Sequence, residues 1–183
     1  PEVLARMTDV LAHRGPDDAG SYTSDLKTHA PQGLLPGVAL GHRRLSIIDI
    51  AGGHQPLSNE DGSVWIVFNG EIYNHHELRQ RLEGSGHKFR TKSDTEAIVH
   101  LYEDEGLELA SHLNGMFALA IWDARHRRLV VARDRLGKKP LYYRIDRSRM
   151  LFASELKSLL QVPGLERQID LQALDEYLTL QYV

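Results

Sequence analysis

The sequence MFALAIWDARHRRLVVA occupies residues 116–132, and its two apolar ends flank the polar stretch DARHR. Two apolar runs joined by a short polar turn predict a β-hairpin with antiparallel strands. The pattern recurs downstream, where Leu141–Tyr143 and Met150–Phe152 flank a polar turn at residues 146–149. Consecutive hairpins therefore predict antiparallel pairing throughout this part of the chain.

Upstream of the hairpins, the sequence predicts a helix and further strands. Apolar residues recur at helical spacing over Pro1–His13, and Gly15-Pro16 is expected to end that helix. Residues 37–49 contain strand-like stretches. Val64–Phe68 is a short continuous apolar run, which is typical of a buried strand, and we expect that strand to end at Asn69-Gly70.

Two segments carry the signals of a helix start. In the capping box Ser93-Asp94-Thr95-Glu96, the Ser93 hydroxyl would accept a hydrogen bond from one unpaired N–H, and Glu96 would reach back to another. Asp170 is placed to cap a helix after the linker Pro163-Gly164. Helices before and after antiparallel strands predict an α+β layered fold rather than a doubly wound parallel sheet.

The composition is that of a folded, water-soluble domain, with 42% hydrophobic and 26% charged residues. A formal net charge of -3 gives no reason to expect nucleic acid or an anionic membrane as partner. The longest apolar run, at 116–122, is far shorter than the ~20 residues of a membrane-spanning helix. The first residues lack the features of a secretory signal, so we expect a cytoplasmic protein.

Neither disulfide bonds nor a zinc–thiolate site is expected, because the sequence contains no cysteine. The ten histidines show no obvious metal-ligand spacing. His75 and His76, for example, are adjacent and would point in different directions on a helix. We therefore predict no metal site from the sequence.

Four segments hold more polar groups beside apolar strands than packing requires. Taken singly, each has an ordinary explanation: Asn-Gly after a strand is typical of a turn, Ser-x-x-Glu of a helix cap, and an Arg pair on a strand of a solvated face. The segments are His13–Asp17, Arg43–Asp49, Asn69–Asn74 and Ser93–Glu96.

Together with Asp134–Tyr143 and Phe152–Leu159, these segments resemble the class II glutamine amidotransferases, a family of N-terminal-nucleophile enzymes. Within it they resemble the asparagine-synthetase branch. The resemblance covers nearly the whole chain and implies a four-layer α/β/β/α sandwich of two antiparallel sheets. It also implies a glutaminase domain at residues 1–162, followed at 163–183 by a linker and the start of an ATP-dependent synthetase domain.

The resemblance implies a glutamine-binding site made of charged and backbone groups. A planar guanidinium at Arg44 suits the α-carboxylate of glutamine, and Glu71 and Asp94 suit its α-ammonium. The Asn69 side chain and the Gly70 N–H would stabilise the oxyanion formed during hydrolysis. The implied glutamine-binding residues are Arg44, Leu45, Ser46, Ile47, Ile48, Asn69, Gly70, Glu71 and Asp94.

In the family that this sequence resembles, the nucleophile is an N-terminal cysteine whose own α-amino group acts as the base. An amino group with a pKa of roughly 7.7–8.0 suits proton transfer at neutral pH. Because the sequence begins at Pro1 and lacks cysteine, we expect a strand and the nucleophile on the order of 10–20 residues upstream. The 183 residues alone are therefore expected to be inactive.

The function implied is glutamine hydrolysis to glutamate and ammonia for ATP-dependent amide formation, with asparagine from aspartate as the leading expectation. No cofactor is expected in this domain, and ATP and Mg²⁺ would belong to the synthetase domain. The expected partners are L-glutamine and the protein's own synthetase domain. A sheet edge uncovered by the missing strand would also favour a homodimer.

Three alternatives differ from this function. The ammonia could serve an acceptor other than aspartate, or the chain could be a non-catalytic glutamine-binding domain. A nucleic-acid or polyphosphate binder is suggested by ten Lys/Arg against three Asp over residues 123–149. That last reading is disfavoured, because the basic residues alternate with strand residues and Ala132 replaces the first glycine of a phosphate-binding loop.

Overall fold

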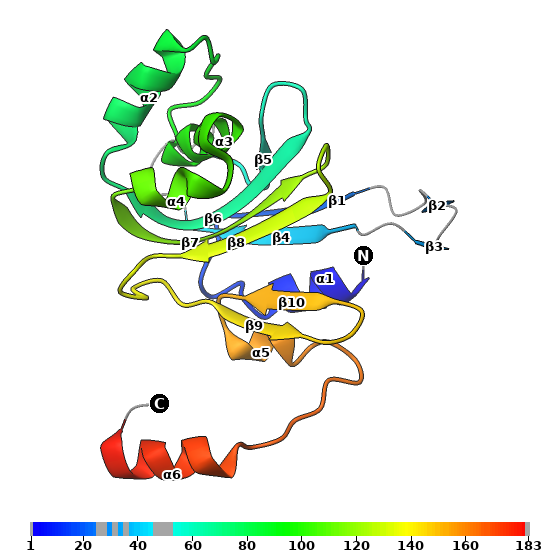
Figure 1. Ribbon diagram of the computed structural model, residues 1–183. Coiled ribbons are helices and arrows are strands. Elements are labelled where there is room, and N and C mark those ends of the chain that lie inside the picture. The colour runs from blue at the N-terminus through cyan, green and yellow to red at the C-terminus, as the bar shows by residue number, and fades with distance from the viewer. Residues whose placement is uncertain (1, 25–28, 31–32, 35–36, 46–52, 182–183) are drawn as a thin grey trace.

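The computed structural model describes residues 2–24, 29–30, 33–34, 37–45 and 53–181. These residues form an α+β fold in which the paired strands are antiparallel (Figure 1). The predicted fold class is confirmed at this level. Within the described part, no helix has the length and apolar character needed to cross a membrane.

The larger sheet has four strands in the order β5-β6-β7-β8. They are β5 (Leu57–Ser58), β6 (Val64–Ile72), β7 (Gly115–Asp123) and β8 (Arg128–Arg133). Strands β7 and β8 form the hairpin predicted from residues 116–132, which is confirmed. Strands β6 and β7 pair along their whole length, so the apolar run at 64–68 lies at the centre of the sheet.

Helices cover one face of this sheet (Figure 1). They are α2 (His75–Gly84), α3 (Asp94–Glu105), the 3-10 helix η1 (Gly106–Glu108) and α4 (Leu109–His112). Apolar side chains from α3 and β6 are buried in one core, which explains why α3 is buried over residues 94–102. The core includes Ile66, Phe68, Ile72, Leu82, Ile98, Leu101, Tyr102, Leu119 and Ile121.

A second sheet lies against the other face and consists of β1 (Asp18–Thr23) and β4 (Ala39–Arg44). Val38 and Leu40 pack in one cluster with Val67, Ala120 and Trp122 of the larger sheet. Helix α1 (Glu2–Asp9) packs against β4. The β1–β4 connection holds two very short strands, β2 (His29–Ala30) and β3 (Gly33–Leu34).

The C-terminal part begins with the second predicted hairpin, which is also confirmed. It consists of β9 (Tyr142–Ile145) and β10 (Met150–Ala153), followed by α5 (Leu156–Leu159) and α6 (Leu171–Leu180). The side chain of Asp170 accepts hydrogen bonds from the N–H groups of Gln172 and Ala173 and so caps α6, as predicted. Helix α6 buries none of its residues and stands apart at the end of the linker (Figure 1).

One helix boundary and one capping contact differ from the sequence prediction. Helix α1 ends at Asp9 rather than near His13. The following residues form turns instead, in which the Leu11 N–H donates to the Thr8 carbonyl and the Ala12 N–H to the Asp9 carbonyl. The Ser93 hydroxyl caps α3 through the Thr95 N–H as predicted, but Glu96 does not return to Ser93. Its carboxylate accepts instead from the Arg90 and Thr91 N–H groups, at 2.7 Å each.

Strand β6 also runs further than predicted. Asn69 and Gly70 lie inside the strand, which continues to Ile72, so they form neither its end nor a turn. A Cβ at Gly70 would overlap the carbonyl oxygen of Met116 on β7. Glycine is therefore required at position 70 by the close approach of β6 to β7. In the upstream region predicted as strand-like, β4 covers Ala39–Arg44, and residues 46–49 lie outside the described ranges.

We predict that Gly70→Ala lowers the free energy of unfolding by about 1–3 kcal/mol, because the added methyl group forces β6 and β7 apart. Gly84→Ala is the matched control, since a Cβ at this helical position meets no atom within 4 Å. It should leave stability unchanged or raise it by up to about 1 kcal/mol. Urea unfolding followed by circular dichroism measures both. Equal stability of the two variants would contradict the prediction.

Candidate functional site

The edge of β6 opposite β7 is completed by side chains rather than by a strand. Strand β5 pairs only with Trp65 and Ile66. Beyond this point, the Phe68 N–H donates to Gln55 Oε1 at 2.7 Å, and the Ile72 N–H donates to Asp94 Oδ2 at 3.0 Å. Two side chains that are distant in sequence therefore satisfy backbone groups that the sheet leaves unpaired.

The Gly70 N–H lies between these two bonded groups. Successive residues of a strand direct their N–H groups to alternate sides, so Gly70 shares the edge used by Phe68 and Ile72. Among the residues that the structure describes, none accepts a hydrogen bond from the Gly70 N–H. This edge thus presents one backbone donor that remains available to a ligand.

A hydrogen bond from His42 joins the second sheet to the same edge. His42 Nε2 lies 3.1 Å from the Phe68 carbonyl oxygen, one residue from Asn69. Burial lowers the pKa of His42 to about 4, and the nearby Arg44 adds to this effect. The ring is therefore neutral at pH 7, and we assign the proton to Nε2, which donates to the carbonyl.

Arg44 and Asn69 lie on the facing sides of the two sheets. Leu40 and Val67 pack together between the sheets. Because side chains on a strand alternate with a period of two, Arg44 shares the face of Leu40, and Asn69 shares the face of Val67. Arg44 is only 8% exposed, at the last position of β4. The alternation also places Glu71, which is exposed, on the face of Asn69.

Asp94 is the buried carboxylate of this region, at 6% exposure and at the first position of α3. Burial raises the pKa of Asp94, and the hydrogen bond from the Ile72 N–H partly opposes that shift. A neighbouring cation would favour the charged form of this carboxylate.

Five of the predicted residues come from three elements: Arg44 from β4, Asn69, Gly70 and Glu71 from β6, and Asp94 from α3. Strand β6 contacts both β4 and α3. Leu45 follows directly after β4 and is 56% exposed. The remaining predicted residues Ser46, Ile47 and Ile48 lie outside the described ranges.

Sequence reasoning missed His42 and Gln55. His42 lies between Leu40 and Arg44 in the alternation of β4, which is the signal that could have identified it. Gln55 had no local signal. It is 7% exposed, and its Nε2 donates to Thr95 Oγ1 at 3.4 Å, so its role depends on contacts with two distant elements.

The flanking motif segments support the site structurally. Gly15 packs so closely against the end of β4 that a Cβ would overlap the backbone of Arg43 and Arg44. The Asp17 N–H donates to the Arg44 carbonyl at 3.1 Å. Arg14 Nε lies 3.4 Å from Glu155 Oε1, so the segments at 13–17 and 152–159 contact each other.

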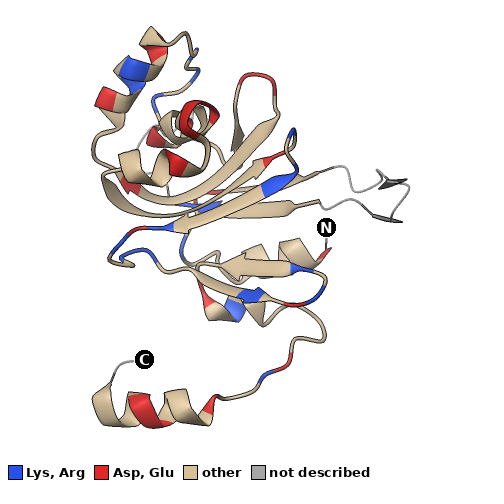
Figure 2. Cartoon of the chain, in the orientation of Figure 1, with Lys and Arg blue, Asp and Glu red and all other residues tan. Residues whose placement is uncertain are grey.

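The carboxylate of Asp134 organises the motif segment at 134–143. It accepts hydrogen bonds from four backbone N–H groups, those of Phe117, Leu136, Lys138 and Lys139. Burial alone would raise the pKa of Asp134, but these four donors lower it below its usual value. The part of this segment before β9 is thus a loop fixed onto β7, and its basic residues lie on that loop (Figure 2).

Comparison with known proteins relates the chain to amide-transferring enzymes. Residues 1–183 match the family model described as a glutamine amidotransferase domain. The chain is 44% identical over 182 residues to asparagine synthetase [glutamine-hydrolyzing] 1 of Bacillus subtilis, covering 100% of this chain and 27% of that protein. It is 44% identical over 168 residues to asparagine synthetase [glutamine-hydrolyzing] 2 of the same organism, covering 92% of this chain and 21% of that protein.

A solved structure has a similar fold. It is the glutamine phosphoribosylpyrophosphate amidotransferase from Bacillus subtilis, with a TM-score of 0.70 and 28% sequence identity, covering 87% of this chain and 40% of that one. The present chain spans only about a quarter of the length of the asparagine synthetases that it matches.

Proposed function

The chain belongs to the glutamine amidotransferase domain family, and on that premise we propose that it binds L-glutamine and takes part in hydrolysing its side-chain amide. The observation that carries the proposal is the available N–H of Gly70, held between two bonded N–H groups. Asn69 adjoins it, and Arg44 lies on the facing sheet.

The charged residues suit the two ends of the amino-acid group. The Arg44 guanidinium can make a two-point contact with the α-carboxylate of glutamine. Glu71 and Asp94 would surround the α-ammonium. Without substrate, burial raises the pKa of the Asp94 carboxyl. Binding the ammonium would favour the charged carboxylate and so offset part of the cost of burying that charge.

The backbone and amide donors suit the reacting carbonyl. Attack by a thiolate on the side-chain carbonyl carbon moves the π electrons onto oxygen, and the Gly70 N–H and Asn69 amide would donate to that oxyanion. Collapse of this intermediate breaks the C–N bond. The α-amino group of the cysteine, which took the thiol proton, would protonate the leaving nitrogen, so that ammonia departs and a thioester remains. Water then hydrolyses the thioester to glutamate and the free thiol. One such donor is worth about 2.7–4 kcal/mol of transition-state stabilisation.

We extend the proposal to the architecture and to the larger protein. Helices cover one face of the larger sheet, the smaller sheet packs on its other face, and α1 packs against β4. This order of layers supports a four-layer α/β/β/α sandwich of the N-terminal-nucleophile type. Residues 1–162 would be the glutaminase domain, and residues 163–183 a linker leading into a synthetase domain. The ammonia would serve asparagine formation from aspartate, in a step to which ATP and Mg²⁺ belong.

In a form of the protein extended to a processed N-terminal cysteine, the residues of the site predict different kinetic effects for two substitutions. Arg44→Lys should raise KM for glutamine about tenfold or more, because an ammonium cannot reproduce the two-point contact. Asn69→Ala should lower kcat by roughly 10²–10³, with much less effect on KM, because its amide acts on the oxyanion. Arg144→Lys, at an exposed position on β9, is the control. Equal effects of both substitutions on both parameters would remove the basis for these roles.

The nucleophile can be tested directly, because the 183 residues contain no cysteine. We expect this chain to release no ammonia from glutamine, and a version extended to a processed N-terminal cysteine to do so. Replacing that cysteine by alanine should abolish the activity. Comparable rates with and without the extension would show that the assigned nucleophile is wrong. Glutamine binding without hydrolysis by the extended form would support the non-catalytic binding domain instead.

A further inference from the structure

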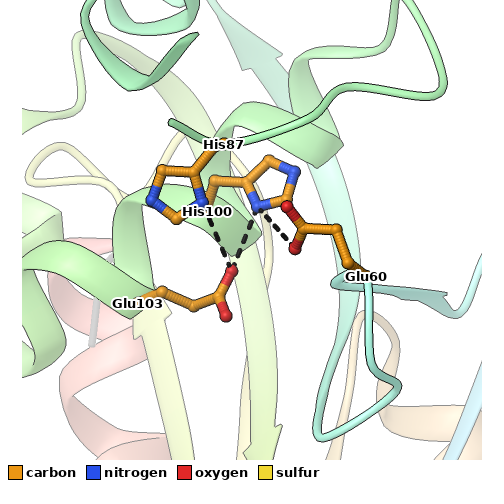
Figure 3. Close-up of side chains that lie close together, drawn as sticks. All are labelled: Glu60, His87, His100 and Glu103. Carbon is orange, nitrogen blue, oxygen red and sulfur yellow. Dashed lines mark hydrogen bonds and ion pairs between the residues drawn. The ribbon is translucent and has the colours of Figure 1, made fainter. Parts of the chain in front are cut away.

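Two histidines and two glutamates meet on the helical side of the larger sheet, in a cluster that the proposed hydrolysis does not use. One potential ligand atom from each lies within 4.8 Å of every other. Figure 3 shows their side chains pointing toward one another from three segments. These residues are Glu60 from the β5–β6 connection, His87 from the α2–α3 connection, and His100 and Glu103 from α3.

We propose that this cluster binds one Zn²⁺ ion, with four protein ligands: Glu60, His87, His100 and Glu103. The sequence did not predict a metal site, because the ligands are scattered over more than forty residues and only one pair has helical spacing. The fold brings them together by packing two connections against α3.

The distances between the ligand atoms agree with the size of a tetrahedral zinc site. Zn–N and Zn–O bonds of about 2.0–2.2 Å place neighbouring ligand atoms roughly 3.3–3.6 Å apart. His100 Nδ1 lies 3.0 Å from Glu103 Oε2 and 3.5 Å from Glu60 Oε2, and His87 Nδ1 lies 3.7 Å from Glu103 Oε2. The four ligand atoms therefore need only small shifts to surround an ion.

The other atom of each glutamate is already held from outside the cluster. Glu103 Oε1 accepts a hydrogen bond from Asn59 Nδ2 at 2.7 Å. Glu60 Oε1 accepts one from the Lys88 N–H at 3.1 Å. Each carboxylate thus directs its second oxygen, Oε2, toward the histidines, and its orientation is fixed before any ion binds.

One of the two histidines is already held from outside the cluster, and the other has a carboxylate close behind it. His87 Nε2 lies 3.0 Å from Asp104 Oδ1, which leaves Nδ1 directed at the cluster. His100 is 1% exposed, and its Nε2 is buried without a hydrogen-bond partner, 3.8 Å from Glu96 Oε1. A small rotation that brings Nδ1 onto an ion would let Nε2–H donate to Glu96. Histidine ligands of metals usually have such a carboxylate or carbonyl partner behind them.

The ligand set favours zinc over the common hard cations. Two imidazole nitrogens suit Zn²⁺ and other borderline transition ions, whereas Mg²⁺ and Ca²⁺ prefer oxygen ligands alone. Histidine must lose its proton to bind a metal, and two carboxylates with two deprotonated imidazoles balance the double positive charge of the ion. Acidic residues lie in the β5–β6 connection and along α3 (Figure 2), so the surroundings attract a cation.

An ion at this position would connect three segments of the helical layer. The nearest proposed glutamine-binding residue, Asp94, lies six residues before His100 on α3, or about 9 Å along the helix. The ion would therefore fix the position of α3 relative to both connections without contacting glutamine. Its expected effect is on stability rather than on the chemistry of hydrolysis.

The purified protein, stripped of metal with a chelator, can be titrated with Zn²⁺ by calorimetry and with Co²⁺ by visible absorption, which distinguishes tetrahedral from octahedral coordination. We expect the wild type to bind one equivalent more Zn²⁺ than the double variant carrying Glu60→Gln and His87→Gln. Each single substitution should raise the dissociation constant for that Zn²⁺ ion at least tenfold. Both positions are partly exposed, at 39% and 15% of the side chain, so the fold should tolerate the changes.

His112→Gln is the matched control, because His112 pairs with Glu105 at 3.5 Å on the same helical layer but outside the cluster. It should leave the affinity for Zn²⁺ and the Co²⁺ spectrum unchanged. The proposal would be overturned if the wild type and the double variant bound Zn²⁺ with the same stoichiometry and affinity. It would also be overturned by a site that Mg²⁺ occupies as readily as Zn²⁺.

Discussion

Strand β6 extends beyond its neighbour β5, which pairs only with Trp65 and Ile66. The backbone groups on that edge of β6 after Ile66 therefore need other hydrogen-bond partners. Leaving a buried backbone group unpaired costs about 1–3 kcal/mol, so the sequence must supply partners for Phe68 and Ile72. Gln55 and Asp94 do so from two distant segments. Because these two side chains occupy the positions on either side of Gly70, they leave one N–H at a defined place. The same contacts that complete the sheet therefore prepare the proposed oxyanion donor.

The two sheets divide the recognition of the proposed substrate between them. The smaller sheet carries Arg44 at the end of β4, and the larger sheet carries Asn69 and Gly70. The neutral ring of His42 joins the two sheets through the carbonyl of Phe68, so a hydrogen bond across the interface links the strand of Arg44 to the strand of the proposed oxyanion donors. Helix α3 adds Asp94 at its first residue and two of the four proposed zinc ligands further along, which makes it the element common to both proposed sites.

Local sequence patterns predicted the elements whose structure depends on neighbours in sequence. Both hairpins and the Asp170 cap belong to this group. The strand through Asn69-Gly70 was predicted too short, because Asn-Gly is a turn signal and only pairing with β7 overrides it. Gln55 and the cluster proposed to bind zinc required contacts between segments far apart in sequence, and no local pattern encodes these. The proposed glutamine-binding residues came from a resemblance, whereas the elements that carry them came from the fold.

Amide hydrogen exchange of the three residues along the β6 edge tests the central claim most directly. Two-dimensional NMR of the ligand-free protein resolves the N–H groups of Phe68, Gly70 and Ile72 individually. If Gln55 and Asp94 complete this edge and leave one donor available, the Gly70 amide exchanges at least tenfold faster than the two that flank it, because exchange follows the loss of hydrogen bonding and burial. Equal protection of all three amides would contradict the account, since Gly70 would then have a partner within the protein and would not be available to an oxyanion.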